Sequence, residues 1–376
     1  MGGFVRTAMD EVTFLDFYKG SIMSSSNKFQ HFICKQLEAE NKITYDLQCK
    51  LGDDENTLYV ESKRDVKSII LKTTTSKTCM NFYEKLEYKK LYKYSVPFIY
   101  EHGEKSIDDV LKEKQITLFD YEKFQPDYII DTMLKDVKPI AYKEDGKYFI
   151  KFVLQKAYFQ QDIYERIDYR YPIVIYINPD ISIIEIRYDS MRYSYDNQVD
   201  NDVYSKIVLY CIKWIKDNLE LELFTCEHKD IIKKINDNQN TEVRMYKQMM
   251  DMSTGGAAEL TASENGDYVL PFIGELRELI DENEELFRDA IEIKQLLLQY
   301  LNEKEATASY PYIYVKWVKP VETESYVVKI TFDYFNGKYT LLQHITGKCS
   351  DLGMGRMNDA IQYLSKSGSF VKGEEV

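Results

Sequence analysis

Three side chains near the start of the chain have the types and spacing that metal-dependent phosphodiester chemistry needs. Asp46 lies in an expected strand, Ile43–Leu51, and Glu61 and Lys63 lie in the next expected strand, Thr57–Arg64. Residues two apart on a strand project from the same face, so this glutamate and lysine would act together. Two carboxylates can hold a hard cation such as Mg²⁺, which lowers the pKa of a bound water, and the lysine would position or activate that water.

This arrangement resembles the metal-dependent nucleases of the PD-(D/E)xK type, in which an acidic residue on one strand and Glu-x-Lys on the next hold Mg²⁺ against a scissile phosphate. The resemblance implies that Asp46 and Glu61 are metal ligands and that Lys63 is catalytic. Glu38, in the helix-like segment Asn27–Asn41, is available as a further ligand. Glu-x-Lys recurs elsewhere in the chain, but only here does it lie in an alternating strand pattern after a strand that carries a carboxylate.

The segment departs from that family in two respects. Asp65–Thr75 is rich in β-branched residues and predicts a third strand, where the family usually has a helix. Asp46 lies in the middle of its strand, without the turn that commonly presents this acid. The alternative interpretation is an antiparallel meander in which Leu58 and Val60 face inward and the charged residues pair across strands on a solvated face.

The whole chain has the composition of a globular protein with two or three domains. It has 376 residues, of which 44% are apolar and 30% charged, which is enough for a substantial core. The pattern predicts an α+β fold with mixed and antiparallel sheets and hairpins. The polar stretch Tyr193–Asp202 divides it into an N-terminal α+β domain, 1–195, and an acidic C-terminal α+β domain, 196–376, with a long helix.

Several elements are predicted from their periodicity and turn residues. Tyr171–Ile177 and Ile181–Tyr188 form a hairpin around Asn178–Asp180, and its almost wholly apolar first strand is expected to be buried on both faces. The other expected helices are Asn81–Lys93, a helix capped by Ser106, Val203–Leu219 and Met357–Ser365. The other expected strands are Gly146–Leu154, Val243–Met252, Ala258–Ala262 and a C-terminal meander of Tyr312–Lys319, Ser325–Phe335 and Lys338–Ile345 with a two-residue turn at Asn336–Gly337.

The long helix predicted at 271–304 is the main candidate for an interaction surface. Pro271 suits a first helical turn, and the apolar residues that follow recur at spacings of three, four or seven. This spacing predicts a coiled-coil arm or dimer interface carried by Leu279, Leu286, Ile293 and Leu297. The alternative is a core helix that lies across a sheet, because the repeat is short.

A glycine-rich loop before the last helix is a candidate anion site. Gly353 and Gly355 precede a helix whose first N–H groups can hold a phosphate, and Lys348 and Arg356 add positive charge. The loop lacks the Walker and dinucleotide-binding fingerprints. The alternative is an ordinary connection between elements.

Charge is distributed unevenly along the chain. The formal net charge is −13, and residues 1–195 hold 29 basic against 31 acidic side chains, which leaves 20 against 31 for residues 196–376. Since lysine and arginine supply most phosphate contacts, any nucleic-acid surface is expected in the N-terminal half. The second half would repel a polyanion unless its charges segregate by face.

The chain shows no membrane or export signal. No apolar run approaches the roughly 18 to 20 residues needed to cross a bilayer, and the N-terminus lacks a signal sequence. A cytoplasmic location with no membrane partner is therefore expected. The six cysteines contain no Cys-x-x-Cys pair and are expected to be reduced, and Cys226 with His228 brings too few ligands for a metal site. The spacing of Cys34 and His31 on one helix face suits a thiolate pair or core packing.

Two functional hypotheses follow. The first is a non-catalytic binding or assembly subunit of an intracellular complex, without a cofactor, that binds a protein partner or forms a homo-oligomer. The second is a Mg²⁺-dependent nuclease that acts on DNA or RNA through the N-terminal half. The residues assign no pathway, and an accessory role such as antiviral defence is an expectation from base rates alone.

Overall fold

The computed structural model shows an α+β protein, as the sequence predicts. It describes residues 11–45, 57–63, 65–74, 77–101, 103, 105–121, 133–160, 165–191, 202–227, 231, 234–235, 243–251, 257–261, 273–307, 309–318, 325–346, 353–368 and 370–376. Contacts divide the chain into unit 1 (Met1–Thr225, Lys348–Asp359 and Lys372–Val376) and unit 2 (Cys226–Gly347 and Ala360–Val371). The predicted division at residue 195 differs from this contact-based boundary and stays a prediction.

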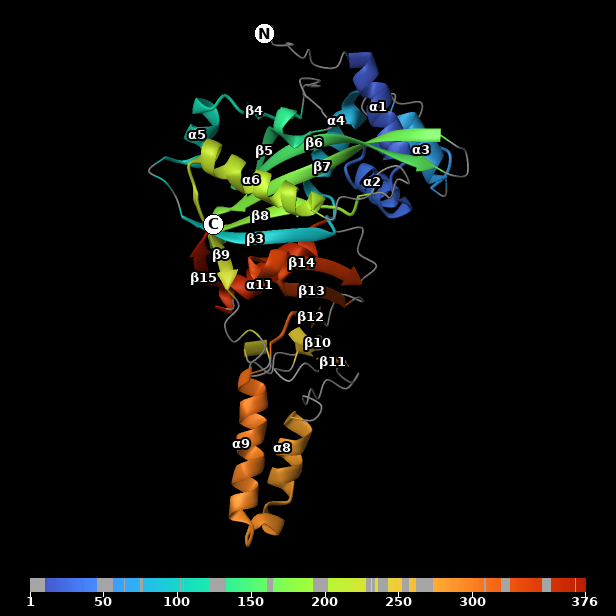
Figure 1. Cartoon of the computed structure of the whole chain (residues 1–376). Helices are drawn as coiled ribbons and strands as arrows, with labels where there is room; N and C mark the ends of the chain where they lie inside the picture. The colour runs from blue at the N-terminus through green and yellow to red at the C-terminus, as the bar shows by residue number, and fades with distance from the viewer. Residues whose placement is uncertain are drawn as a thin grey trace. The chain divides into compact units, whose positions relative to one another are not determined.

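A sheet of antiparallel strands forms the centre of unit 1, with one parallel pair at its β4 end (Figure 1). Its strands follow the order β3 (Tyr94–Glu101), β8 (Ile183–Tyr188), β7 (Glu165–Asn178), β6 (Lys147–Gln160), β5 (Ile140–Glu144) and β4 (Thr117–Leu118). β9 (Glu222–Glu227) pairs with β3 and with β15 (Val371–Glu375). The predicted hairpin is confirmed, since β7 and β8 are joined by the short helix η3 (Pro179–Ile181) and the second half of β7 is buried.

The two faces of this sheet differ in chemistry. One face is mostly apolar and packs against α6 (Val203–Leu219), which has the predicted bounds and whose Trp214 meets Phe152 edge to face at 5.2 Å between ring centroids. The opposite face carries Lys151, Arg170 and Arg187, and α4 (Lys77–Lys89) supplies the carboxylates that face two of them. Alternation along a strand places such residues on one side.

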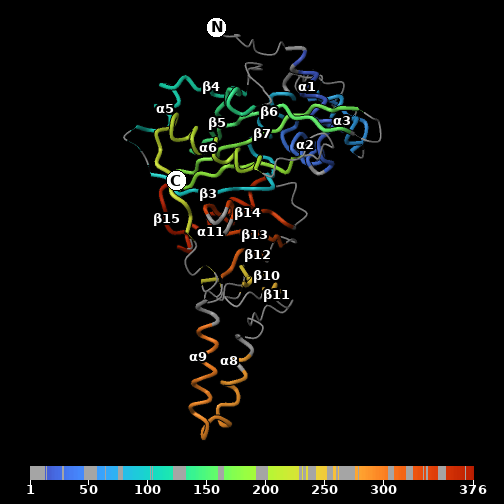
Figure 2. Tube along the Cα trace, in the orientation of Figure 1, coloured from blue at the N-terminus to red at the C-terminus, as the bar shows by residue number. Residues whose placement is uncertain are grey.

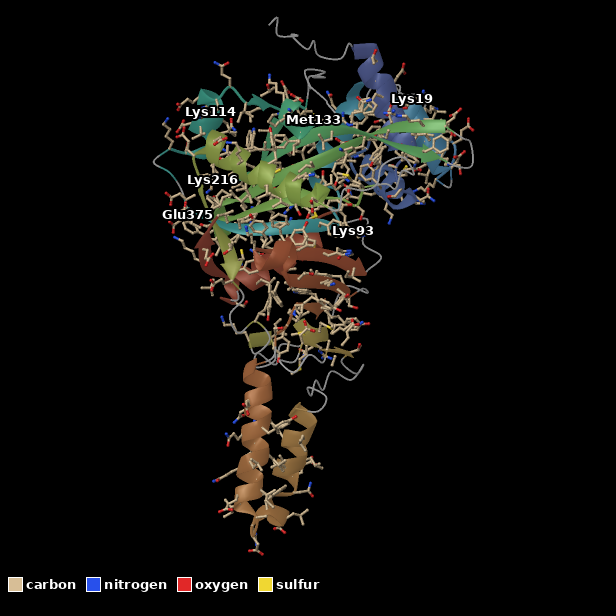
Figure 3. The ribbon with its side chains drawn as sticks, viewed as in Figure 1. Lys19, Lys93, Lys114, Met133, Lys216 and Glu375 are labelled. Atoms are coloured by element: carbon tan, nitrogen blue, oxygen red, sulfur yellow. The ribbon has the colours of Figure 1, made fainter. Side chains whose placement is uncertain are left out.

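Smaller helices surround the sheet of unit 1. They are α1 (Glu11–Met23), α2 (Asn27–Ala39), α3 (Val66–Thr73), α5 (Ile107–Glu113) and the short η2 (Leu134–Asp136). The Ser106 side chain caps α5 as predicted, because its Oγ accepts from the N–H of Asp109. Figure 3 labels Lys216 on α6, whose ammonium donates to the carbonyl oxygen of Val376 at the chain end.

The meander predicted for residues 43–75 is wrong. β1 (Ile43–Thr44) and β2 (Leu58–Tyr59) are two-residue strands that pair in parallel, and the predicted strand Asp65–Thr75 contains α3. The side chain of Asp65 accepts from the N–H of Ser68 at 3.0 Å and so caps the helix. The buried residues Ile69, Ile70 and Thr73 share one helical face. Packing of that face outweighs the strand preference of β-branched residues.

Antiparallel strands also form the centre of unit 2. Its strands follow the order β11 (Ala257–Thr261), β10 (Val243–Asp251), β12 (Tyr312–Trp317), β13 (Tyr326–Asp333) and β14 (Tyr339–Thr346). The two-residue turn predicted at Asn336–Gly337 is wrong, because the short helix α10 (Tyr334–Gly337) joins β13 to β14. Phe335 stacks on Tyr339, which favours this longer connection although the positive φ of 60° at Phe335 is strained.

The single long helix predicted at 271–304 is also wrong. The chain forms α8 (Ile273–Glu282), the short helix η4 (Glu284–Phe287) and α9 (Ile291–Thr307). Acidic residues crowd the C-terminal end of α8, where the helix dipole disfavours negative charge. Asn283 donates from its side chain to the carbonyl of Leu279 at 2.8 Å and ends the helix. The chain then turns back, and α8 and α9 lie side by side (Figure 2).

The last helix, α11 (Gly355–Lys366), confirms the prediction at Met357–Ser365. Its first residues belong to unit 1 and the others to unit 2. Within unit 2, Tyr363 of α11 meets Trp317 of β12 edge to face. In the part of the chain that the structure describes, every helix is too short or too polar to pass through a bilayer.

Candidate functional site

The helical hairpin of α8 and α9 has an interior of its own. Ile280 and Leu301 are buried together with Met250 of β10, and Leu276, Phe287, Leu297, Leu298 and Tyr310 pack against them. The hairpin is also linked by polar contacts, from Arg277 Nη2 to Asn302 Oδ1 at 2.7 Å and from Lys294 Nζ to Glu284 Oε1 at 2.9 Å. These contacts fix the antiparallel register of the two helices.

A second apolar stripe on α9 faces away from that interior. Ile293, Leu296 and Tyr300 are exposed by 56%, 66% and 55% and follow one another at spacings of three and four, so they share a helical face. Leu279, Leu286 and Ile291 are exposed by 56%, 77% and 61%. Isolated exposed apolar residues are ordinary, whereas a contiguous set marks an interaction surface. We call the six exposed side chains Leu279, Leu286, Ile291, Ile293, Leu296 and Tyr300 the hairpin surface, of which Ile293, Leu296 and Tyr300 share one face of α9.

The hairpin is strongly acidic. Residues 273–307 contain ten acidic and four basic side chains, which gives a formal charge of −6. Lys294 is paired with Glu284 and Arg288 with Glu285, so two of the four cations are already neutralised. The hairpin surface therefore combines exposed apolar side chains with a negative field.

The predicted interface residues lie in two different environments. Leu279, Leu286 and Ile293 belong to the hairpin surface, whereas Leu297 is half-buried and packs inside the hairpin. The sequence reasoning missed Ile291, Leu296 and Tyr300, although the spacing of the last two from Ile293 was visible as a helical stripe. Whether these residues form an interface stays a prediction.

The predicted catalytic residues are only partly brought together. Lys63 forms an ion pair with Glu38, and its ammonium lies 4.6 Å from the ring centroid of Tyr45. Glu61 is exposed in a bend beyond the end of β2, so it does not share a strand face with Lys63. Asp46 lies outside the described residues. Among the residues that are described, no three His, Cys, Asp or Glu side chains gather closely enough to hold a metal ion.

The glycine-rich loop has a packing role that the sequence does not reveal. Gly353 has a φ of +54°, and a Cβ there would lie 2.3 Å from the carbonyl oxygen of Lys89 at the end of α4. Next to it, the N–H of Met354 donates to that carbonyl at 3.1 Å. Gly355 begins α11 and Arg356 is buried, whereas Lys348 lies outside the described ranges. Anion binding by these residues stays a prediction.

A buried ionic cluster lies beneath α4, and the sequence reasoning did not find it. Lys151 Nζ donates to Glu87 Oε2 at 3.0 Å, and Arg170 Nη2 donates to Glu87 Oε2 at 2.8 Å and to Glu84 Oε2 at 3.0 Å. Burial raises the pKa of Glu87, but the charges of Arg170 and Lys151 outweigh it and lower that pKa to about 2. Tyr18 stacks on the Arg170 guanidinium at 4.1 Å.

This cluster is suited to positioning α4 and α1 on the sheet. It holds two cations and two carboxylates, so its charges balance without a ligand. A second buried pair supports the same face: Arg187 Nη2 donates to Glu185 Oε1 at 2.8 Å and to Asn358 Oδ1 at 2.6 Å. Glu185 and Arg187 lie two apart on β8 and therefore share one face of the strand.

Cys34 and His31 lie on α2 in an environment that does not favour a thiolate. Burial raises the pKa of the Cys34 thiol to about 12, which disfavours a thiolate. His31 Nδ1 lies 2.7 Å from the carbonyl oxygen of Asn27, on its own helix. His228 lies outside the described residues, so the Cys226 pair stays a prediction.

Comparisons with protein-family models, with curated proteins and with solved structures give no match to this chain.

Proposed function

We propose that this protein is an assembly subunit whose α8–α9 hairpin binds a basic amphipathic helix of another protein. The observation that carries the proposal is the exposed stripe of Ile293, Leu296 and Tyr300 on a helix whose other apolar face is already packed. A helix with apolar residues on two faces is stable in water only when both faces gain partners. Helix-in-groove recognition uses anchors at this spacing.

Charge selects the kind of partner. The hairpin carries a formal charge of −6, so two copies placed face to face would repel each other. A helix with lysine or arginine beside its apolar stripe would be attracted and held in register. We therefore favour a basic protein partner over a homo-oligomer.

The test uses two synthetic amphipathic peptides with the same leucine pattern, one with lysine and the other with glutamate at its polar positions. The full chain should bind the lysine peptide and not the glutamate peptide. Ile293→Ser/Leu296→Ser/Tyr300→Ser should lower the affinity at least about tenfold, since each anchor contributes roughly 1 kcal/mol or more. This variant keeps every charge, so the loss isolates the apolar stripe.

The matched control is Gln295→Ser/Gln299→Ser, on exposed positions of the same helix. It should bind like the parent chain. Equal loss in both variants, or equal binding of the two peptides, would contradict the proposal. A dimer in light scattering that the triple variant abolishes would assign the hairpin surface to a second copy instead.

A Mg²⁺-dependent nuclease is the second candidate function. It is favoured by the ion pair between Glu38 and Lys63, which joins two of the four predicted residues. It is also favoured by α3, because a helix follows the Glu-x-Lys segment where a strand was expected.

A further inference from the structure

The sheet of unit 2 has one face that is rich in tyrosine and basic side chains. Along β12, Ile313, Val315 and Trp317 are buried, so the alternate residues Tyr312, Tyr314 and Lys316 share the opposite face and are partly exposed. Neighbouring strands add further residues of the same kind. We call Arg244, Tyr246, Tyr312, Tyr314, Lys316 and Lys329 the tyrosine–lysine face.

Strand register places the rings and the ammonium groups in alternation. Tyr314 lies between Lys247 of β10 and Lys329 of β13, and each ammonium is 5.6 Å from its ring centroid. Lys329 also lies 3.7 Å from the ring centroid of Tyr312, which meets Tyr314 edge to face at 5.7 Å. Two tyrosine rings are thus held side by side among flexible cations.

A β-bulge adds a third ring to this face. The register of β10 against β12 shifts between Met245 and Lys247, which leaves Tyr246 as the extra residue. Bulges redirect side chains in this way. Tyr246 is 38% exposed, and Lys316 lies 5.9 Å from its ring centroid, so this ring joins the same face.

Two cations of this face, Arg244 and Lys316, are not neutralised by the described residues of the sheet. Arg244 and Lys316 are directly opposite each other on β10 and β12, and like charges in that position are unfavourable. Within the described residues, neither has an ion pair with a carboxylate, whereas Lys247 pairs with Glu259. An anion placed over Arg244 and Lys316 would relieve their repulsion.

The charges of the second half therefore segregate by face. The chain has a net charge of −13, and the hairpin alone holds −6, whereas the tyrosine–lysine face has three cations and three neutral rings, with Asp251 and the Lys247–Glu259 ion pair beside it. The net negative charge of residues 196–376 would repel a polyanion, whereas the cations of this face would attract it. The charge count of each half of the chain, from which a nucleic-acid surface was expected in the N-terminal half, does not show where the charges lie on the surface.

We propose that the tyrosine–lysine face binds single-stranded nucleic acid. Unpaired bases would stack on Tyr246, Tyr312 and Tyr314, as bases do on aromatic residues of open sheets. The lysines that now lie over the rings would turn to the phosphates, and Arg244 with Lys316 would hold a phosphate between them. A duplex keeps its base faces stacked inside, so it offers these rings no partner.

The test measures anisotropy of labelled 12-nucleotide oligo-dT and oligo-U, a duplex of equal length and a poly-glutamate peptide with the full chain. We expect either single strand or both to bind at least about tenfold more tightly than the duplex and the peptide. Preference for oligo-dT assigns DNA, and preference for oligo-U assigns RNA. Equal binding of the duplex would overturn the stacking argument, and equal binding of poly-glutamate would assign the face to an acidic protein.

Two pairs of substitutions separate stacking from charge. Tyr312→Ala/Tyr314→Ala should weaken single-strand binding by about tenfold or more without changing the salt dependence, because stacking contributes roughly 1 to 3 kcal/mol per base. Arg244→Ala/Lys316→Ala should weaken binding and reduce the slope of log affinity against log salt by about 0.7, since the two side chains hold one phosphate and each phosphate contact contributes about 0.7 for single strands. Tyr312→Phe/Tyr314→Phe should restore the affinity.

The matched control, Lys213→Ala/Lys366→Ala, removes two exposed cations elsewhere. It should leave single-strand affinity and its salt slope unchanged. Equal weakening in this control, or an unchanged slope in the Arg244 variant, would overturn the proposal. None of these substitutions touches the α8–α9 hairpin, so the outcome is independent of the proposed protein partner.

Discussion

The ammonium of Lys151 on β6 lies 3.0 Å from Glu87 Oε2 on α4, and both side chains are buried. Arg170 from β7 donates to the same carboxylate oxygen at 2.8 Å. Opposite charges this close favour the ionised carboxylate even though burial opposes it. A helix and two strands are thereby joined at one point of the interior.

This cluster predicts a defined dependence of stability on pH. The pKa of Glu87 falls from 4.5 to about 2 in the folded chain. Because the folded pKa is lowered, the stabilisation is fully present above about pH 4.5 and is lost as the pH falls toward 2. A shift of this size corresponds to about 3 kcal/mol of unfolding free energy.

Glu87→Gln should therefore lower the free energy of unfolding by about 3 to 5 kcal/mol at pH 7, because two buried cations would then share the single negative charge of Glu84 in this cluster. The difference from the parent chain should shrink at pH 3, because there Glu87 binds a proton in the unfolded parent chain but stays mostly ionised in the folded one. Urea unfolding followed by tryptophan fluorescence at both pH values measures this. Glu113→Gln, which removes an exposed ion pair with Lys105, serves as the control and should change little. If Glu87→Gln lowers the free energy of unfolding by the same amount at pH 7 and at pH 3, the lowered pKa of Glu87 is contradicted.

The glycine-rich loop gives a second prediction about stability. Gly353→Ala should lower the free energy of unfolding by more than about 2 kcal/mol, because a Cβ would collide with the Lys89 carbonyl at a positive φ. The measurement is thermal or urea unfolding without added ligand.

Gly20→Ala is the matched control. Gly20 lies within α1 and a Cβ there has no neighbour within 4 Å, so alanine should raise stability by about 0.5 to 1 kcal/mol. If Gly353→Ala unfolds like the parent chain, the glycine does not serve packing, and its proposed role in anion binding gains weight.

The sequence predicted elements well where local pattern and packing agree. The β7–β8 hairpin has apolar strands and a proline-containing turn, and α6 has one continuous apolar stripe, so both were found. The prediction from sequence failed where a helix cap and burial in the tertiary structure outweighed the local strand preference. Asp65–Thr75 has strand-forming residues, but the cap at Asp65 and burial of Ile70 make it a helix.

The candidate sites depend on tertiary contacts that the spacing of residues along the sequence does not predict. The heptad-like pattern of 271–304 indicated an apolar surface, but only the turn at Asn283 decides that Leu297 packs inward while Ile293 stays exposed. The cluster of Glu84, Glu87, Lys151 and Arg170 joins residues 64 to 86 positions apart. The tyrosine–lysine face likewise depends on strand register and a bulge.

The nuclease hypothesis gives the last prediction. Asp46→Ala/Glu61→Ala should leave binding of the lysine peptide and of single strands unchanged within about twofold, because Glu61 is exposed and Lys63 is already paired with Glu38. Leu286→Ser/Ile293→Ser should weaken binding of the lysine peptide without affecting binding of the single strands.

Incubation of the parent chain with DNA and RNA in Mg²⁺ or Mn²⁺ should leave both nucleic acids intact. Cleavage that requires the metal and disappears in the folded carboxylate variant would instead establish the enzyme, since only bound metal makes these two carboxylates essential.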